Sequence, residues 1–275
     1  MAKTISILGC GWLGLPLGQH LVQHGYHVKG STTTPEKLDT LAEADIEPYL
    51  IELAPGVSGK VVSDFFRADV LFLNIPPGRW RPDVEAHFGA QMDAVIKELH
   101  YSSIGFVVFA SSTSVYEDMN GVVVEADAGK PRPWSLSGRA LLDAECRLQA
   151  DTHFDTTILR LAGLYGHGRH PGRFLAGRKD LDNGGAPVNL VHRDDVIAIA
   201  AQVITDEVRG AVFNVCADVH PMRKTFYRQA ARHLGLEPPT FASDEATSYK
   251  IVSNEQVKKR LGYQFQHPDP ATHAP

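Results

Sequence analysis

The chain has 275 residues, of which 43% are hydrophobic and 21% are charged, and its formal net charge is −5. Its 24 glycines and 17 prolines are close to ordinary globular usage, which excludes a collagen-like or wholly disordered chain. The apolar stretches are shorter than the roughly 18 residues of a membrane span, and no secretory signal peptide is visible. A net acidic chain also disfavours nucleic acid as a partner. We therefore expect a cytoplasmic protein that binds neither nucleic acid nor a membrane.

Strand-like and helix-like segments alternate along the first 161 residues. Short apolar runs rich in β-branched residues predict strands, and apolar residues three or four apart predict helices. Strands are expected over residues 4–8, 26–31, 46–52, 70–75, 105–110, 156–161 and 212–215, and helices over 12–24, 35–42, 83–101, 138–150, 194–204 and 221–236. Several of these strands are apolar on both faces, which is typical of a parallel sheet covered by helices on both sides.

A glycine-rich segment, GCGWLG at residues 9–14, lies between the first strand and the first helix. In the GxGxxG pattern the first glycine allows a tight turn, the second lets the backbone approach a pyrophosphate, and the third lets helix and strand pack closely. The helix N-terminus adds free N–H groups and the positive end of its dipole. We predict a dinucleotide site here, with tight packing as the alternative. Its residues are Gly9, Gly11, Trp12, Leu13 and Gly14.

The residues after the second strand bear on which dinucleotide binds. An Asp or Glu there would bind the ribose 2′-hydroxyl of NAD, but the chain has the neutral sequence GSTTT at 30–34 and no acid before Glu36. This composition would not repel a 2′-phosphate, so NADP is favoured over NAD. No arginine is present to clamp that phosphate, and the hydroxyls could instead only shape the loop and cap the next helix. The residues assigned to this contact are Ser31, Thr32, Thr33 and Lys37.

Four segments in order resemble motifs of the extended short-chain dehydrogenases/reductases, the NAD-dependent epimerase/dehydratase superfamily. Besides the glycine loop, they are ASSTSVY at 110–116, RLAGLYGHGR at 160–169 and VHRDDV at 191–196. The resemblance covers residues 4–265 and points to the atypical, YeeZ-like bacterial branch. It implies a Rossmann-type doubly wound sheet, a bound nicotinamide dinucleotide, and oxidoreductase or epimerase-type chemistry.

The chain departs from this family at its general acid/base. The family's Tyr and Lys of YxxxK correspond to Ser137 and Leu141, and a serine without a neighbouring base is a poor proton donor. By the resemblance, Ser112 would hydrogen-bond the reacting substrate oxygen. We predict that Ser112 and Tyr116 carry the proton route, unless Tyr116 is a packing residue, and Ser137 is the third catalytic candidate. The loss of the pair also leaves open a non-catalytic, NAD(P)-binding sensor or regulatory protein.

Further site residues are assigned at the carboxyl ends of strands, where open α/β sheets bind ligands. Several are arginines, which suggest an anionic substrate or else a solvated loop. Arg139 could replace the missing Lys or be a surface charge, and His167 could titrate near neutrality or be one of many solvated histidines. The remaining cofactor candidates are Ile75, Pro76, Pro77, Arg139, Leu161, Ala162 and Gly163. The substrate candidates are Arg79, Arg81, Ser112, Tyr165, Arg169 and Arg173.

No metal site is predicted. His20 and His24 are four residues apart on the first helix, but their segment, HLVQH, lacks the Glu of HExxH and no third ligand is indicated.

We predict an NAD(P)-binding Rossmann domain over residues 1–165. The C-terminal region, 166–275, returns in part to that domain at about 188–216 and in part forms a small substrate lobe. The predicted protein is a monomer or homodimer and acts on a small polar, anionic molecule.

Overall fold

The structure, a computed structural model, describes residues 3–54, 56–78 and 80–273. Its contacts divide the chain into two compact units. Unit 1 comprises residues 1–115, 132–160 and 199–212, and unit 2 comprises 116–131, 161–198 and 213–275. The chain passes between the units several times. The sequence placed one boundary at residue 165 and a partial return to the first domain at about 188–216, and this division stays a prediction.

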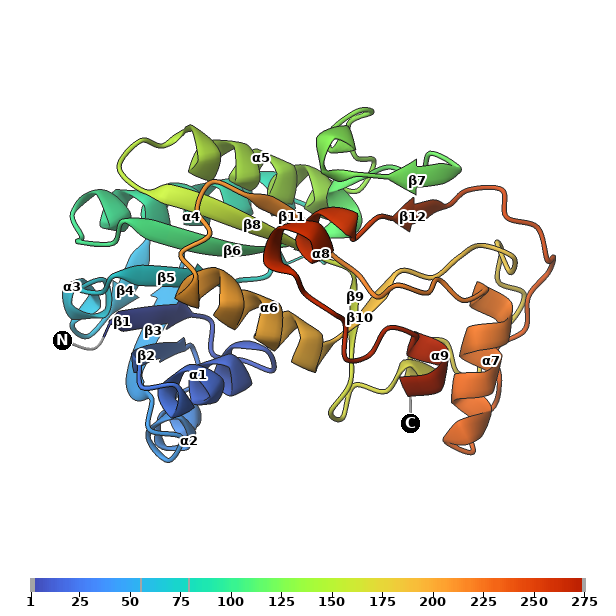
Figure 1. Cartoon of the computed structure of the whole chain (residues 1–275), viewed down its shortest axis with the longest axis horizontal. Coiled ribbons are helices and arrows are strands. Elements are labelled where there is room, and N and C mark those ends of the chain that lie inside the picture. Colours follow the sequence, from blue (N-terminus) through green and yellow to red (C-terminus); the bar gives the residue numbers. More distant parts are fainter. Residues whose placement is uncertain (1–2, 55, 79, 274–275) are drawn as a thin grey trace. The chain divides into compact units, whose positions relative to one another are not determined.

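An eight-stranded, mostly parallel sheet has the order β11-β8-β6-β5-β1-β2-β3-β4 (Figure 1). From β1, the strands β2, β3 and β4 follow on one side, and β5, β6, β8 and β11 follow on the other. The strand order therefore reverses between β1 and β5. Such a switch point is where open α/β sheets bind ligands. The strands are β1 (Thr4–Leu8), β2 (His27–Thr32), β3 (Glu47–Leu53), β4 (Val57–Gly59), β5 (Val70–Leu73), β6 (Phe106–Ser112), β8 (Asp155–Leu161) and β11 (Val212–Val215). The predicted doubly wound α/β fold is confirmed.

The central strands are buried on both faces, as their sequences predict. All four residues of β5 and the first four of β6 have no exposed surface. In the parallel register Ile7 pairs with Phe72, and Leu71 pairs with Val107. This burial removes the apolar side chains of both faces from water, which is the main favourable contribution to the free energy of folding.

The helices of unit 1 bury one apolar stripe each against the strands. They are α1 (Gly14–Gln23), α2 (Leu38–Ala42), α3 (Val62–Phe65), α4 (Val84–His100) and α5 (Leu136–Ala150). Along α4 the buried residues recur every three or four positions, from Val84 to Leu99. Figure 1 shows α1 and α2 on one side of the strands and α5 on the other. The helix predicted over 35–42 instead begins as a 3₁₀ turn over Pro35–Lys37 and continues as α2.

Unit 2 contains two small parallel sheets, β10-β9 and β12-β7, and a core formed by Tyr165, Leu190 and Phe226. Its elements are β7 (Gly121–Val123), β9 (Gly163–Tyr165), β10 (Leu190–His192), β12 (Lys250–Val252), α7 (Arg223–His233), α8 (Glu255–Leu261) and α9 (Pro270–His273), and α6 (Arg193–Thr205) begins here and ends in unit 1. Strands of three residues show too little alternation to be recognised in the sequence, so none of these small strands was predicted.

Over the ranges that the structure describes, no helix combines the length and the apolar character that crossing a membrane requires.

Candidate functional site

The three glycines of the loop at the ends of β1 and β5 are needed for different reasons. Gly9 has a φ of +106°, and a Cβ there would lie 2.3 Å from the carbonyl oxygen of Asn74. A Cβ on Gly14 would lie 2.3 Å from the carbonyl oxygen of Gly9. At Gly11, by contrast, no atom of the described residues lies within 4 Å of such a Cβ. Packing inside the protein therefore explains Gly9 and Gly14 but not Gly11.

A hydrogen-bond network holds this loop in place. The N–H of Gly9 donates to the Ser31 hydroxyl over 2.9 Å, and the N–H of Cys10 donates to the Ser31 carbonyl over 2.8 Å. On the other side, the Asn74 amide donates to the Gly9 carbonyl over 3.0 Å. The loop is thus preorganised at the switch point of the sheet, between β1 and β5.

The start of α1 fits a phosphate group. Its N-cap residue is Leu13, so no side chain in the described part of the chain caps the helix, and its first turn holds no acidic residue. The first N–H groups of a helix need acceptors, and a pyrophosphate can supply them where the backbone can be approached. In α1 the Leu15 N–H already donates to the Gly11 carbonyl over 3.0 Å and residue 16 is a proline, so the N–H groups offered to a phosphate are those that precede Leu15. The open space at Gly11 lies beside this helix start. The residues present therefore fit the predicted dinucleotide, with Leu13 buried and Trp12 half-buried.

The hydroxyl residues at the end of β2 differ in exposure: two of them are buried and make hydrogen bonds within the protein, and Thr33 is exposed. Ser31 is 2% exposed, and its hydroxyl is used by the loop. The Thr32 hydroxyl is also buried and accepts a bond of 3.1 Å from the N–H of Thr34. The exposed members are Thr33 and Lys37. Contact with a ribose 2′ group is therefore a prediction for Thr33 and Lys37, whereas Ser31 and Thr32 shape the loop, as the sequence alternative held.

The segments of Ser112 and Ser137 meet at one turn of unit 1. The Ser112 hydroxyl ends β6 and accepts a bond of 3.2 Å from the N–H of Ser114, which leaves its own proton available for donation. A Cβ on Gly138 would lie only 2.2 Å from the Ser114 carbonyl oxygen. The first turn of α5, which contains Ser137, therefore packs directly on the turn that follows Ser112.

Leu141 stands at the position of the family's lysine, and Arg139 is the candidate replacement for that lysine. Leu141 is 4% exposed and belongs to the core of unit 1. Arg139 donates two hydrogen bonds of 3.0 Å to the carboxylate of Glu85 on α4. The hydrogen bond from Arg139 lowers the pKa of Glu85, so the pair is charged at neutral pH. The guanidinium of Arg139 therefore has a bidentate partner within the protein, and its contact with a cofactor stays a prediction.

Tyr116 is buried within unit 2, and the structure supports its packing role. The phenol is 2% exposed and donates a hydrogen bond of 2.6 Å to the Asn214 side chain. The Asn214 amide donates in turn to the Ser253 carbonyl over 3.0 Å. A phenol held in this way is not placed to give its proton to a substrate, and this argues against the catalytic role predicted for Tyr116.

Unit 2 also brings together a group that we name the His167 cluster: His167, His192 and Asp194. The Nε2 atom of His167 lies 2.8 and 2.9 Å from the two carboxylate oxygens of Asp194. Nδ1 of His192 lies 3.6 Å from Oδ2 of the same carboxylate. The sequence singled out His167 alone, because its partners lie in the separate VHRDDV segment.

The surroundings of this cluster shift the pKa values of His192 and Asp194. Burial lowers the pKa of His192 to about 4, and the charge of His267, whose ring centroid lies 3.7 Å away, adds to the effect. Burial acts to raise the pKa of Asp194, but the hydrogen bond from His167 and the charges of the neighbouring histidines and Arg193 together outweigh it, so this pKa is lowered. Tyr165 packs edge-on against His192; it is fully buried, and its hydroxyl has no hydrogen-bond partner within the described chain.

The other substrate candidates are arginines, and those that the structure describes are exposed. Arg169 and Arg173 are exposed in unit 2. Arg81 in unit 1 forms two hydrogen bonds of 3.0 Å with Asp83, which neutralises much of its charge. Arg79 lies outside the described residues.

The remaining cofactor candidates lie at strand ends in both units. Ile75 and Pro77 are half-buried and Pro76 is exposed, whereas Leu161 and Ala162 are buried. A Cβ on Gly163 would lie 2.7 Å from a methyl carbon of Leu190, so packing on β10 is a sufficient reason for this glycine. Cofactor contacts of these residues stay predictions.

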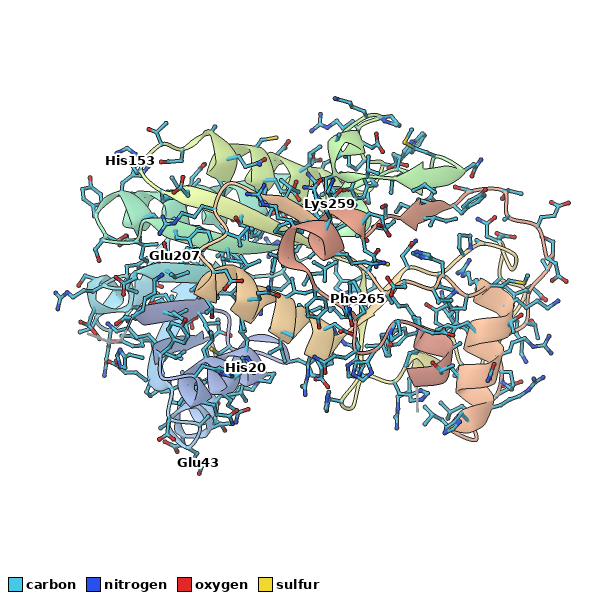
Figure 2. The ribbon with its side chains drawn as sticks, in the orientation of Figure 1. His20, Glu43, His153, Glu207, Lys259 and Phe265 are labelled. Atoms are coloured by element: carbon cyan, nitrogen blue, oxygen red, sulfur yellow. The ribbon has the colours of Figure 1, made fainter. Side chains whose placement is uncertain are left out.

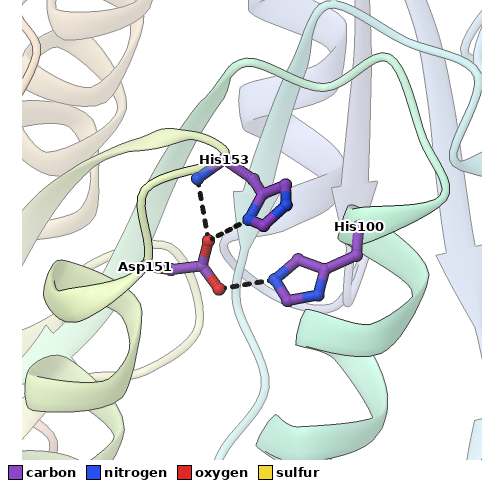
Figure 3. A group of neighbouring side chains, drawn as sticks. All are labelled: His100, Asp151 and His153. Atoms are coloured by element: carbon purple, nitrogen blue, oxygen red, sulfur yellow. Dashed lines mark hydrogen bonds and ion pairs between the residues drawn. The ribbon is translucent and has the colours of Figure 1, made fainter.

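Two further histidine groups lie in unit 1. The rings of His20, which is labelled in Figure 2, and His24 are 4.3 Å apart on α1. Figure 3 shows a second group, the His100 cluster, formed by His100, Asp151 and His153. In it Nε2 of His100 lies 2.6 Å from one Asp151 oxygen, and Nδ1 of His153 lies 3.2 Å from the other.

The chain is similar to known proteins in both sequence and fold. No model of a known protein family matches it. It is 39% identical over 272 residues to Protein YeeZ of Escherichia coli (strain K12), covering 98% of this chain and 97% of that protein. Among solved structures, MoeE5 in complex with UDP-glucose and NAD matches with 21% identity and a TM-score of 0.73, covering 96% of this chain and 93% of that one. UDP-glucose 4-epimerase of Thermotoga maritima with UDP-glucose matches with 17% identity and a TM-score of 0.72, covering 96% and 94%.

The doubly wound sheet with its glycine loop at the β1/β5 switch point is the fold of the extended short-chain dehydrogenases/reductases, the NAD-dependent epimerase/dehydratase class. The chain itself belongs to the YeeZ family. The resemblance expected from the sequence motifs is thereby confirmed.

Proposed function

We propose that unit 1 binds a nicotinamide dinucleotide and that the protein is an NAD(P)-dependent enzyme of oxidoreductase or epimerase type, acting on a small polar, anionic substrate. The open position at Gly11, beside the uncapped start of α1, carries this proposal. It is the feature of the loop for which the protein's own packing gives no reason. The presence of NAD in MoeE5, which shares the fold, supports the choice of ligand.

The residues of unit 1 would divide the work of binding. The N–H groups at the start of α1 would take the pyrophosphate, and Gly11 would let it approach the backbone. Thr33 and Lys37 are exposed where the ribose 2′ group would lie, and a neutral hydroxyl with a nearby cation suits a 2′-phosphate. NADP is therefore the proposed cofactor in preference to NAD.

The catalytic step would depend on orientation more than on a tuned acid. A bound nicotinamide supplies the acceptor or donor of a hydride. Ser112 would hydrogen-bond the reacting oxygen with the proton that its contact to Ser114 leaves available. Ser137, in the first turn of α5, which packs on the turn after Ser112, is the second hydroxyl candidate. Because Leu141 supplies no positive charge, neither serine has a lowered pKa from that source, and we expect slow turnover near neutral pH.

A second candidate function is NAD(P) binding without turnover, as a sensor or regulatory protein. Three observations favour it. The position of the family's Lys is a buried leucine, Leu141. The two groups that could have replaced the missing pair, the Arg139 guanidinium and the Tyr116 phenol, are bound to Glu85 and Asn214.

Binding and turnover are tested in that order. Ligand at 100 times its Kd stabilises the folded state by about 2.7 kcal/mol, so NADPH should raise the melting temperature of the wild type. Gly11→Val should abolish this shift. Gly56→Val is the matched control, because Gly56 also has no atom of the described residues near a Cβ and no positive φ. An equal shift in both variants would contradict the proposed site. Nucleotide sugars and small keto acids, followed by nicotinamide absorbance and product analysis, then separate the enzyme from the non-catalytic alternative.

A further inference from the structure

We propose that the His167 cluster of unit 2 is a binding site for a divalent transition-metal ion of the zinc class. Its three members offer two imidazole nitrogens and a carboxylate, and these ligand atoms all lie within 4.8 Å of one another. All three residues belong to one unit, so their arrangement does not depend on how the two units are placed. The proposal is also independent of dinucleotide binding, which concerns unit 1.

The distances suit a metal ion of this class. Zinc binds histidine nitrogen and carboxylate oxygen at about 2.0–2.2 Å, so its tetrahedral ligand atoms lie roughly 3.3–3.5 Å from one another. Here the nitrogen-to-oxygen separations are 2.8 Å from His167 and 3.6 Å from His192 to Asp194. Small side-chain shifts would therefore bring all three to an ion. Three protein ligands leave a fourth position open, as in catalytic rather than structural zinc sites.

The backbone at His167 has an unusual, positive φ, and the side chain of His167 contacts Asp194. His167 has a φ of +39° and Gly168 a φ of +83°, and the N–H groups of Gly166 and Arg169 each donate to the other's carbonyl, over 3.2 and 2.9 Å. This is a two-residue hairpin turn of the kind that requires two positive φ values. A residue other than glycine is uncommon at such a φ, and backbone outliers of this kind concentrate at functional sites. Asn or Gly would satisfy the turn better, so the turn alone does not explain the histidine.

Gly166 determines which nitrogen of His192 faces the carboxylate. A Cβ on Gly166 would lie 2.3 Å from Nε2 of His192, so that nitrogen packs directly against the backbone of the turn. Nδ1 is left on the side of Asp194, where it accepts a long bond of 3.3 Å from the Asp194 N–H; a bound ion would replace this bond, because the acceptor nitrogen of an imidazole has a single lone pair. The His192 side chain is 7% exposed, and that of His167 is 48% exposed. One ligand is thus buried and oriented, and the other borders solvent, where a water or an anionic oxygen could take the open position.

A simple ion pair between His167 and Asp194 explains less of the arrangement of the three side chains than a metal site does. His167 and Asp194 alone would make such a pair, with no need for a second, buried imidazole at the same carboxylate. The His100 cluster of unit 1 shows the contrast (Figure 3): there Asp151 also accepts a bond of 2.9 Å from the backbone N–H of His153, and the His153 side chain is 62% exposed. That contact is a turn at the end of α5 and needs no ion.

The test is metal binding by the full chain without a polyhistidine tag, after treatment with EDTA and dialysis. Zn²⁺ is titrated by calorimetry, and Co²⁺ is added separately to follow the visible absorption of four-coordinate cobalt. The wild type should bind one equivalent of either ion. His167→Asn should weaken binding at least about tenfold, as should Asp194→Asn. Asparagine tolerates the positive φ of residue 167, so this variant keeps the turn.

His153→Gln is the matched control, because it removes one imidazole from the other histidine–aspartate cluster. It should bind like the wild type. Three results would overturn the proposal: less than stoichiometric binding by the wild type, unchanged binding by both His167→Asn and Asp194→Asn, or loss of binding in His153→Gln. Circular dichroism of each variant shows that it is folded, and Asp194→Asn keeps the proposal testable should His167→Asn fail to fold.

Discussion

The hydroxyl of Ser31, at the end of β2, accepts a hydrogen bond of 2.9 Å from the N–H of Gly9, at the end of β1. This contact fixes the glycine loop from the neighbouring strand, and it assigns to the loop a hydroxyl that the sequence offered to the cofactor. Ser31 therefore belongs to the support of the loop, and the ribose contact stays a prediction for Thr33 and Lys37, which follow β2.

Replacing Ser31 by alanine should weaken both the fold and cofactor binding. The variant leaves the half-buried Gly9 N–H without an acceptor, which costs about 1–3 kcal/mol. We expect a loss of that size in urea denaturation and a higher Kd for NADPH in calorimetry. Ser58→Ala is the control, because that exposed hydroxyl makes only a long bond of 3.5 Å to Glu52. Wild-type stability in Ser31→Ala would show that the bond does not brace the loop.

Thr33→Asp should reverse the cofactor preference. Thr33 is exposed, so a carboxylate there needs no burial, repels a 2′-phosphate and can accept a bond from a free 2′-hydroxyl. The ratio of the Kd for NADP to that for NAD should rise at least about tenfold, or about 1.4 kcal/mol. Thr40→Asp places the same charge at another exposed threonine and should leave the ratio unchanged. Equal ratios in both variants would remove the 2′ role from this loop.

Tyr116→Phe should affect stability and not the cofactor. The change leaves the buried Asn214 oxygen without its 2.6 Å donor, at a cost of about 1–3 kcal/mol in the free energy of unfolding. Affinity for NADPH and any turnover should stay at the wild-type level. Tyr101→Phe, at a side chain 83% exposed, should change neither quantity. A selective fall in kcat with unchanged stability would instead restore Tyr116 as a proton donor.

Asp64 should make part of the stability of unit 1 depend on pH. Hydrogen bonds from Tyr49 and then Lys29 lower the pKa of this carboxyl in the folded state. A lowered native pKa stabilises the fold above the unfolded value of about 3.9, and this contribution is lost as the pH falls through the native pKa. The difference in unfolding free energy between wild type and Asp64→Asn should therefore shrink as the pH is lowered from about 6 towards 3. Asp45→Asn, at an exposed carboxyl, is the control, and a difference that stays constant with pH would contradict the assignment.

The sequence by itself determined the strands of the large sheet, except for the three-residue β4, and the place of the glycine loop. Both depend on short-range patterns: apolar runs such as Val70–Leu73 that are buried on both faces, helical spacing such as that of α4, and three glycines within six residues. The family followed from the same kind of signal, because its motifs are short and ordered along the chain. The departures at Ser137 and Leu141 were likewise visible without coordinates.

Only the tertiary structure decided what the individual side chains do. Ser31 reaches Gly9 across 22 positions, His167 reaches Asp194 across 27, and Tyr116 reaches Asn214 across 98. Local propensity and periodicity are silent about such pairs, because hydrogen bonds and burial depend on which segments the sheet and its connections bring together. The same hydroxyl, imidazole or phenol is therefore a ligand group or a structural contact according to the partner that folding places beside it.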